Sequence, residues 1–139
     1  MTLELIKDKL ATISTNHGQI QHFGYGEEFV IDDLNQGRIN YAFLETPYSI
    51  TYDETNRFKV VQFAFLILFP SMGSDGIVQD HLAISRAELV GEDIIASFKT
   101  QIKPVSRVTS VNGVTIRNVS SADLCGIRYE LELRTNRNC

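Results

Sequence analysis

The stretch from Phe58 to Phe69 constrains the fold more than any other part of this chain, because it is apolar at almost every position. Lys59 and Gln62 are the exceptions. A strand that is apolar on both faces usually lies in the middle of a sheet and is covered on both sides. The run is also far shorter than the roughly 18 to 20 apolar residues that cross a bilayer. We therefore expect a buried central strand and no association with a membrane.

A long amphipathic helix is expected after this strand. Pro70 to Gly76 is rich in turn residues, and Asp75 is placed to cap the helix that follows. Apolar residues then recur at helical spacing on one stripe: Ala83, Ala87, Val90, Ile94 and Phe98. Gly91 lies on this apolar side at a cost of about 1 kcal/mol relative to alanine, which indicates close approach of helix and strand. We predict a helix from about Gly76 to Lys99 that covers the sheet.

The residues before the central strand predict a short helix and several short strands. Thr2 is a candidate N-cap, with Glu4 in the first turn, for a helix marked by four apolar residues: Leu3, Ile6, Leu10 and Ile13. Asn16-His17-Gly18 ends this helix. Strands are expected in three stretches: Gln19 to Tyr25, Tyr41 to Leu44, and Tyr48 to Tyr52. From Gly24 to Asn40 the signals for strand, helical turn and loop conflict.

Two closing strands are predicted after the long helix. Val105 to Val119 is rich in β-branched residues and contains Asn112-Gly113, a strong signal for a type I′ hairpin, although one continuous bulged strand fits as well. From Ile127 to Leu133 apolar and charged residues alternate, which predicts one buried and one charged face. Residues 1–139 are thus expected to form a single α+β domain. Its antiparallel sheet of about four to six strands is packed by one long helix, with a short N-terminal helix.

Composition and charge are typical of a folded protein that does not grip nucleic acid. Hydrophobic residues make up 43% and charged residues 22% of the 139 residues, and the net charge is −4. Residues 1–80 carry 5 basic and 11 acidic side chains, whereas residues 81–139 carry 8 and 6. Subunits in a stack or ring could use this split for complementary faces, although solvated surface charge also produces it. The N-terminus lacks the pattern of a secretory signal, so we expect folding in a cytoplasm.

No residue pattern nominates a catalytic, cofactor or metal site. Gly24-Tyr25-Gly26 lacks the third glycine of a dinucleotide fingerprint and precedes two glutamates, so we interpret it as a turn. Zinc could in principle be held by the three histidines, His17, His22 and His81, with Asp32, Asp33 or Asp80. The histidines lack the spacing that would place such ligands on one face. The serines lack a nucleophile elbow: Ser71, Ser74, Ser120 and Ser121. We expect a protein that is not an enzyme.

Only two cysteines are present, Cys125 and Cys139, which is too few for a disulfide framework. We interpret Cys125, beside Leu124 and ahead of the last strand, as a small apolar filler. Aromatic residues gather among acidic ones in the first half of the chain: Phe23, Tyr25, Tyr41, Tyr48 and Tyr52. Because the interleaved charge is mostly negative, a protein contact fits them better than a platform for single-stranded nucleic acid.

The order of these segments resembles the tail-terminator and tail-completion proteins of tailed bacteriophages. The closing residues Asp123-Leu124-Cys125-Gly126-Ile127-Arg128-Tyr129-Glu130-Leu131-Glu132-Leu133, followed by Asn136-Arg137-Asn138-Cys139, are similar to the Asp-Leu-x-Gly strand and polar, cysteine-ended tail of neck proteins in phages that infect Bacteroidetes. The opening Leu3-Glu4-Leu5-Ile6-Lys7-Asp8-Lys9-Leu10-Ala11-Thr12-Ile13 resembles their first helix. The resemblance transfers no catalytic residue.

This resemblance implies a structural virion protein of the head-to-tail junction, assembled in the host bacterial cytoplasm. The chain would self-associate into a homo-oligomeric ring that joins the connector to the tail and contacts neighbouring neck proteins. Genomic DNA would pass through the ring without specific binding. The alternative is a small α+β protein- or ligand-binding module without a virion role, which presents the aromatic and acidic surface between Phe23 and Tyr52.

Overall fold

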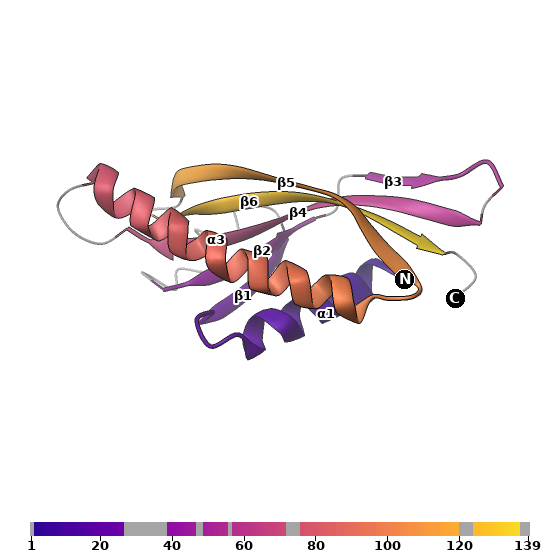
Figure 1. The fold of residues 1–139 in the computed structure, drawn as a ribbon, viewed down its shortest axis with the longest axis horizontal. Coiled ribbons are helices and arrows are strands. Elements are labelled where there is room, and N and C mark those ends of the chain that lie inside the picture. Colours follow the sequence, from indigo (N-terminus) through magenta and orange to yellow (C-terminus); the bar gives the residue numbers. More distant parts are fainter. Residues whose placement is uncertain are drawn as a thin grey trace.

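The computed structural model describes residues 2–26, 39–46, 49–55, 57–71, 76–119 and 124–136. Within them, two helices and six strands follow one another along the chain (Figure 1). In order they are α1 (Leu3–Asn16), β1 (His22–Gly26), β2 (Tyr41–Glu45), β3 (Ser49–Tyr52), β4 (Phe58–Pro70), α3 (Gly76–Gln101), β5 (Ser106–Val119) and β6 (Leu124–Asn136). None of the described helices is both long enough and apolar enough to cross a membrane.

The six strands form one mostly antiparallel sheet in the order β1-β2-β4-β6-β5, with β3 also paired to β4. Only β1 and β2 pair in parallel. Two strands pair with one edge of β4: β3 with the first half of β4 and β2 with the second half. Its other edge pairs with β6 along the whole strand, from Phe58 opposite Asn136 to Pro70 opposite Leu124. The predicted α+β class, with one long and one short helix, is confirmed.

Both helices pack against the same face of the sheet, and α3 lies lengthwise across it (Figure 1). Alternate side chains of β4 and β6 enter this core because successive residues of a strand point to opposite faces. From β4 the contributors are Val61, Phe63, Phe65, Ile67 and Phe69. From β6 they are Cys125, Ile127, Tyr129, Leu131 and Leu133. The alternation predicted for the last strand is therefore confirmed.

The opposite face of the sheet, which we call the far face, carries a second apolar cluster at one end. It consists of Tyr41, Phe43, Leu66, Leu68 and Leu124. Each of these side chains is buried. The central strand β4 thus has buried apolar residues on both faces, which confirms the prediction made from its unbroken apolar sequence.

The first helix begins and ends where the sequence predicts. The Thr2 hydroxyl accepts a hydrogen bond from the Leu5 backbone N–H at 3.2 Å, so Thr2 is the N-cap, and Glu4 lies in the first turn. Ile6, Leu10 and Ile13 form its buried face. His17 is the C-cap residue, and its backbone N–H donates to the Ser14 carbonyl at 3.1 Å.

The long helix α3 ends at Gln101, shortly after the predicted end at Lys99. The apolar stripe predicted for it is its buried face. Ala83, Ala87, Val90, Ile94 and Phe98 are all at most 2% exposed. The close approach predicted at Gly91 is also confirmed, because a Cβ there would lie 2.5 Å from the Tyr129 hydroxyl on β6. The cap predicted at Asp75 lies outside the described residues.

The structure decides between the two alternatives left open at Asn112-Gly113 in favour of the continuous bulged strand, and it shows that one local prediction is wrong. Asn112-Gly113 does not form a hairpin turn, because β5 continues through both residues and pairs with β6 at Glu130 and Tyr129. The pairing is irregular elsewhere, between Val108 and Ser110 and between Ile116 and Val119. Gly24-Tyr25-Gly26 is not a turn either.

Those three residues are the end of β1, paired in parallel with Phe43, Leu44 and Glu45 of β2. Only Gly26 has the positive φ, 134°, that favours glycine. A glycine at the end of a strand can thus mimic a turn signal in the sequence. Most of the stretch with conflicting signals, residues 27–38, lies outside the described residues.

Candidate functional site

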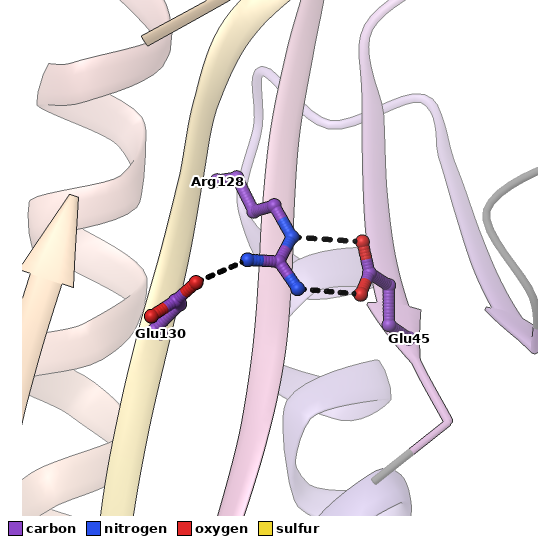
Figure 2. Close-up of polar contacts among 3 residues, drawn as sticks. All are labelled: Glu45, Arg128 and Glu130. Carbon is purple, nitrogen blue, oxygen red and sulfur yellow. Dashed lines mark hydrogen bonds and ion pairs between the residues drawn. The ribbon is translucent and has the colours of Figure 1, made fainter. Parts of the chain in front are cut away.

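The far face of the sheet carries a charged cluster that links β2 and β6 across β4, formed by Glu45 of β2 with Arg128 and Glu130 of β6. Arg128 donates through Nε and Nη2 to the two carboxylate oxygens of Glu45, at 3.0 and 2.9 Å. Its third nitrogen, Nη1, donates to Glu130. Figure 2 shows the guanidinium between the two carboxylates. This bidentate geometry is the strongest arrangement for an arginine and a carboxylate.

The intervening strand β4 leaves room for this contact at Ala64. Ala64 pairs with Glu130, and the neighbouring Phe65 pairs with Leu44, so Glu45 lies one step further along β2. Arg128 pairs with Leu66 and must reach over β4 to meet Glu45. The small Ala64 side chain makes this crossing possible without a steric conflict. The two carboxylates raise the pKa of the Arg128 guanidinium above its already high usual value, chiefly through the Glu45 hydrogen bonds.

Further polar and charged contacts continue along the far face toward the end of β6. Glu132 accepts hydrogen bonds from the Gln62 amide at 3.2 Å and from the Thr109 hydroxyl at 2.9 Å. The Arg134 guanidinium lies 3.7 Å from the centre of the Phe58 ring, a cation–π contact. The sequence predicted a charged face for this strand. The structure shows that its charges are paired rather than freely solvated.

A groove of about 230 Å³ between α1 and α3 is the described feature that most resembles a catalytic pocket. It contains His17, Asp93 and Ser97. His17 Nε2 lies 3.2 Å from the Asp93 carboxylate, and His17 Nδ1 accepts the Gln19 backbone N–H at 3.2 Å. Since both ring nitrogens are engaged, His17 has no nitrogen left to deprotonate the Ser97 hydroxyl. The contact between His17 and Asp93 therefore connects the end of α1 to α3, and these residues do not form a nucleophilic triad with Ser97.

A second polar cluster is buried near the start of α3. Asp80, only 4% exposed, accepts hydrogen bonds from Arg117 Nε at 2.7 Å and from the Cys125 thiol at 3.4 Å. The Ser71 hydroxyl, Arg117 and Cys125 lower the pKa of Asp80, with Ser71 the largest contributor. Asp80 therefore stays ionised and connects α3 to β5 and β6. Cys125 is buried as predicted, and its thiol also belongs to this polar cluster.

The described histidines are not gathered into a metal site. Among the described residues, no three histidine, cysteine, aspartate or glutamate side chains are close enough to hold an ion. The His22 ring instead packs edge-on against Tyr41, with ring centres 5.6 Å apart. His81 is exposed on α3. Five other candidates lie outside the described residues: Asp32, Asp33, Ser74, Ser120 and Ser121.

The aromatic residues proposed as a contact surface do not share one environment. Tyr41 is 1% exposed and belongs to the apolar cluster of the far face. Tyr25 on β1 and Tyr52 on β3 are 42% and 52% exposed. Lys7 lies 5.4 Å above the Tyr25 ring. Tyr48 is outside the described residues. Tyr41 is therefore a core residue, which weakens the idea of a single aromatic binding surface.

Among the described residues, β1, β3 and β5 are edge strands of the sheet, and β5 and β3 are candidate interaction surfaces. β5 forms one edge, and no other strand of the described residues pairs with its outer side. β3 lies on the opposite side of β4, and with the start of β4 it forms a hairpin that extends past the end of α3 (Figure 1). An uncovered strand edge offers backbone N–H and C=O groups to another strand.

Comparisons with known proteins do not assign a family to this chain: no family model matches it, and no curated protein matches it. Functional inference therefore rests on the sequence pattern and on the geometry described above. The described residues present paired charges, edge strands and exposed apolar positions. They do not present an acid, base or nucleophile in a catalytic arrangement.

Proposed function

We propose that this chain is a structural subunit of the head-to-tail junction of a tailed bacteriophage. Copies of it form a ring that joins the connector to the tail and lets the genomic DNA through. The proposal combines the resemblance of the segment order to tail-terminator and tail-completion proteins with the edges of the sheet. In a ring, one surface of each subunit contacts a different surface of the next subunit. Each subunit therefore needs two different, complementary surfaces.

The observation that carries the proposal is the composition of the β5 edge. β5 spans Ser106 to Val119 and contains no proline, aspartate or glutamate, and its charged residues are Arg107 and Arg117. Edge strands of monomeric proteins are usually short or interrupted by proline or a charge. The regular pairing from Ser110 to Ile116 leaves an unprotected stretch suited to strand addition.

The opposite edge carries carboxylates that can meet the arginines of β5. The hairpin that connects β3 to β4 has Asp53 and Glu54 at its tip, followed by Arg57 and Lys59. Asp53 accepts hydrogen bonds from the Thr55 hydroxyl and from the Phe58 backbone N–H, the latter at 3.2 Å. These hydrogen bonds lower the pKa of Asp53, the one from Thr55 most, so its carboxylate remains ionised. The arginines of the β5 edge of one copy and the Asp53 and Glu54 carboxylates of the next would steer a head-to-tail contact.

The paired charges of the far face suit a channel through which DNA must move freely. Phosphate groups bind arginine and lysine side chains that are not already neutralised. Arg128 is engaged by two carboxylates, and the chain carries a net charge of −4. A surface of this kind supports passage rather than retention of DNA.

The test is the mass of the purified protein by light scattering over a range of concentrations, followed by negative-stain imaging. We expect a closed ring of about six or twelve subunits, alone or on a connector template. A protein that stays monomeric at every concentration, and also in the presence of connector and tail proteins, would contradict the proposal.

A further inference from the structure

The outward face of α3 carries a stripe of apolar residues that no described element covers. Leu82, Leu89 and Ala96 are spaced seven residues apart, which places them on one side of a helix. Leu82 is 45% exposed and Leu89 is 64% exposed, the highest value among the large hydrophobic residues of the described chain. The buried residues of α3, such as Ala87 and Ile94, face the sheet on the opposite side.

The residues beside this stripe are arranged so that the helix complements itself in the antiparallel direction. A two-fold axis at Leu89 would place the two Leu89 side chains against each other. The same axis pairs Leu82, seven residues before the centre, with Ala96 of the second copy, seven residues after it. A large side chain therefore meets a small one at each end of the contact, as close packing of helices requires.

The charges follow the same symmetry. Arg86 lies three residues before Leu89 and Asp93 four residues after it, both on the same flank of the stripe. In the antiparallel pair, Arg86 of each copy would face Asp93 of the other. On the other flank, Ser85 would face Glu92. The side chain of Asp93 is 70% exposed although it contacts His17, so its second oxygen can accept a new partner.

We propose that two copies of this chain associate through α3, antiparallel and about a two-fold axis at Leu89. The contact is independent of the proposed ring, because it uses the outer side of the helix layer and leaves both sheet edges open. It predicts pairs of subunits, or pairs of rings, joined back to back through their helices.

Disulfide trapping tests the geometry directly. In a Cys139→Ser background, Leu89→Cys places two thiols at the two-fold axis, where facing helix positions come within the ~4.4–6.8 Å that a disulfide spans between Cα atoms. We expect a rapid covalent dimer under mild oxidation. Leu82→Cys is the matched control, because its two copies would be ~21 Å apart in the antiparallel pair at 1.5 Å per residue. Cross-linking of Leu82→Cys but not Leu89→Cys would overturn the proposal.

Charge exchange gives a second readout that does not depend on cysteine chemistry. Arg86→Glu alone and Asp93→Lys alone each place like charges at both ends of the contact, so each should weaken dimerisation about tenfold or more in analytical ultracentrifugation. An equimolar mixture of the two variants restores opposite charges at both ends and should form heterodimers. Failure of the mixture to associate, with both variants folded by circular dichroism, would also overturn the proposal.

Leu89→Glu distinguishes this contact from the ring. It should abolish the helix-mediated dimer and leave the ring contacts of β3 and β5 unchanged. The helix contact is rejected if the wild-type protein is monomeric whenever no ring forms and Leu89→Cys gives no covalent dimer. Loss of the ring with retention of the Leu89→Cys dimer would reject the proposed function alone.

Discussion

Gly91 and Tyr129 are matched across the interface between α3 and β6: any side chain at residue 91 would occupy space that the tyrosine ring already fills. A Cβ on Gly91 would lie 2.5 Å from Cε2 and from the hydroxyl oxygen of Tyr129. The same ring lies against Gly113 of β5, where a Cβ would be 3.6 Å from Cδ1. Gly91 thus creates the space for the aromatic ring, whereas a Cβ on Gly113 would make only an ordinary van der Waals contact with it.

Gly91→Ala should therefore lower the free energy of unfolding by about 1–3 kcal/mol, because overpacking outweighs the gain in helix propensity. In a Tyr129→Ala background the steric conflict disappears, and the same substitution should become stabilising by about 1 kcal/mol. Urea denaturation of the four proteins measures both effects. Gly18→Ala is the control, since no atom lies within 4 Å of a Cβ at that position. Destabilisation by Gly91→Ala in both backgrounds would contradict this account.

The burial of Tyr129 predicts loss of stability at high pH. Burial, with smaller contributions from Glu88 and Glu92, raises the pKa of Tyr129 to about 12 from its usual 10. The neutral phenol is favoured in the folded state, so its full contribution is present below pH 10 and declines as the pH rises toward 12. We expect the wild-type protein to lose about 2–3 kcal/mol more than Tyr129→Phe across this interval. Identical pH profiles for the two proteins would show that the phenol is not the cause.

The contact between Arg128 and Glu45 should contribute to stability because both side chains are partly buried. Arg128→Met removes the cation and leaves the Glu45 carboxylate, 15% exposed, without its bidentate partner. We expect a loss of about 1–3 kcal/mol in chemical denaturation. Glu45→Gln in the Arg128→Met background should cost little more, since the carboxylate is then already unpaired. Additive effects of the two substitutions would mean that the residues act separately.

Ser14 offers a stabilising substitution. Its side chain is fully buried on α1, and its hydroxyl makes no hydrogen bond with the described residues. Ser14→Ala removes this unsatisfied group and improves helix propensity, so the free energy of unfolding should rise by about 1 kcal/mol. Ser85→Ala, on the exposed side of α3, controls for helix propensity alone. A fall in the melting temperature of Ser14→Ala would show that the hydroxyl has a partner after all.

The ring contact makes its own prediction about charge. Arg107→Glu would place a negative charge on the β5 edge opposite Asp53 and Glu54 of the next copy, and it should reduce ring formation in negative-stain images. Adding Glu54→Arg to the same chain restores opposite charges at every contact and should recover rings. Both residues are exposed in the single chain, so the melting temperature should change little. Equal ring formation by wild type and Arg107→Glu would remove the edge contact from the proposed function.

The local elements were predictable because each depends on side chains that are close in sequence. The cap at Thr2, the stripe on α3 and the alternation on β6 each follow from a repeating pattern within one segment. The choice between hairpin and continuous strand at Asn112-Gly113 could not be made from the sequence. Asn-Gly commonly forms hairpins, but here β5 pairs with β6 along its length, with Gly113 opposite Tyr129. Tertiary packing outweighed the local turn preference.

The polar clusters could not be predicted because they depend on strand order and register. Arg128 and Glu45 are 83 positions apart, and their contact requires β2, β4 and β6 to be neighbours with Ala64 between the two charges. No local signal predicts either condition. Tyr41 was placed on the surface for a similar reason, since a short strand with one tyrosine does not reveal which face its neighbours will cover. The alternating charges of β6 were a visible clue, but their partners were not.

The position of β6 also governs the order in which the sheet can be completed. β6 follows both β4 and β5 in the chain, yet it lies between them and supplies the pairing partner for almost every residue of each. During synthesis, the very apolar β4 must therefore wait, with one edge unpaired, while α3 and β5 are made. The most apolar strand, β4, therefore keeps one edge unpaired until β6 has been synthesised. The folding yield of the chain in cells should depend more on that interval than on the stability of the finished domain.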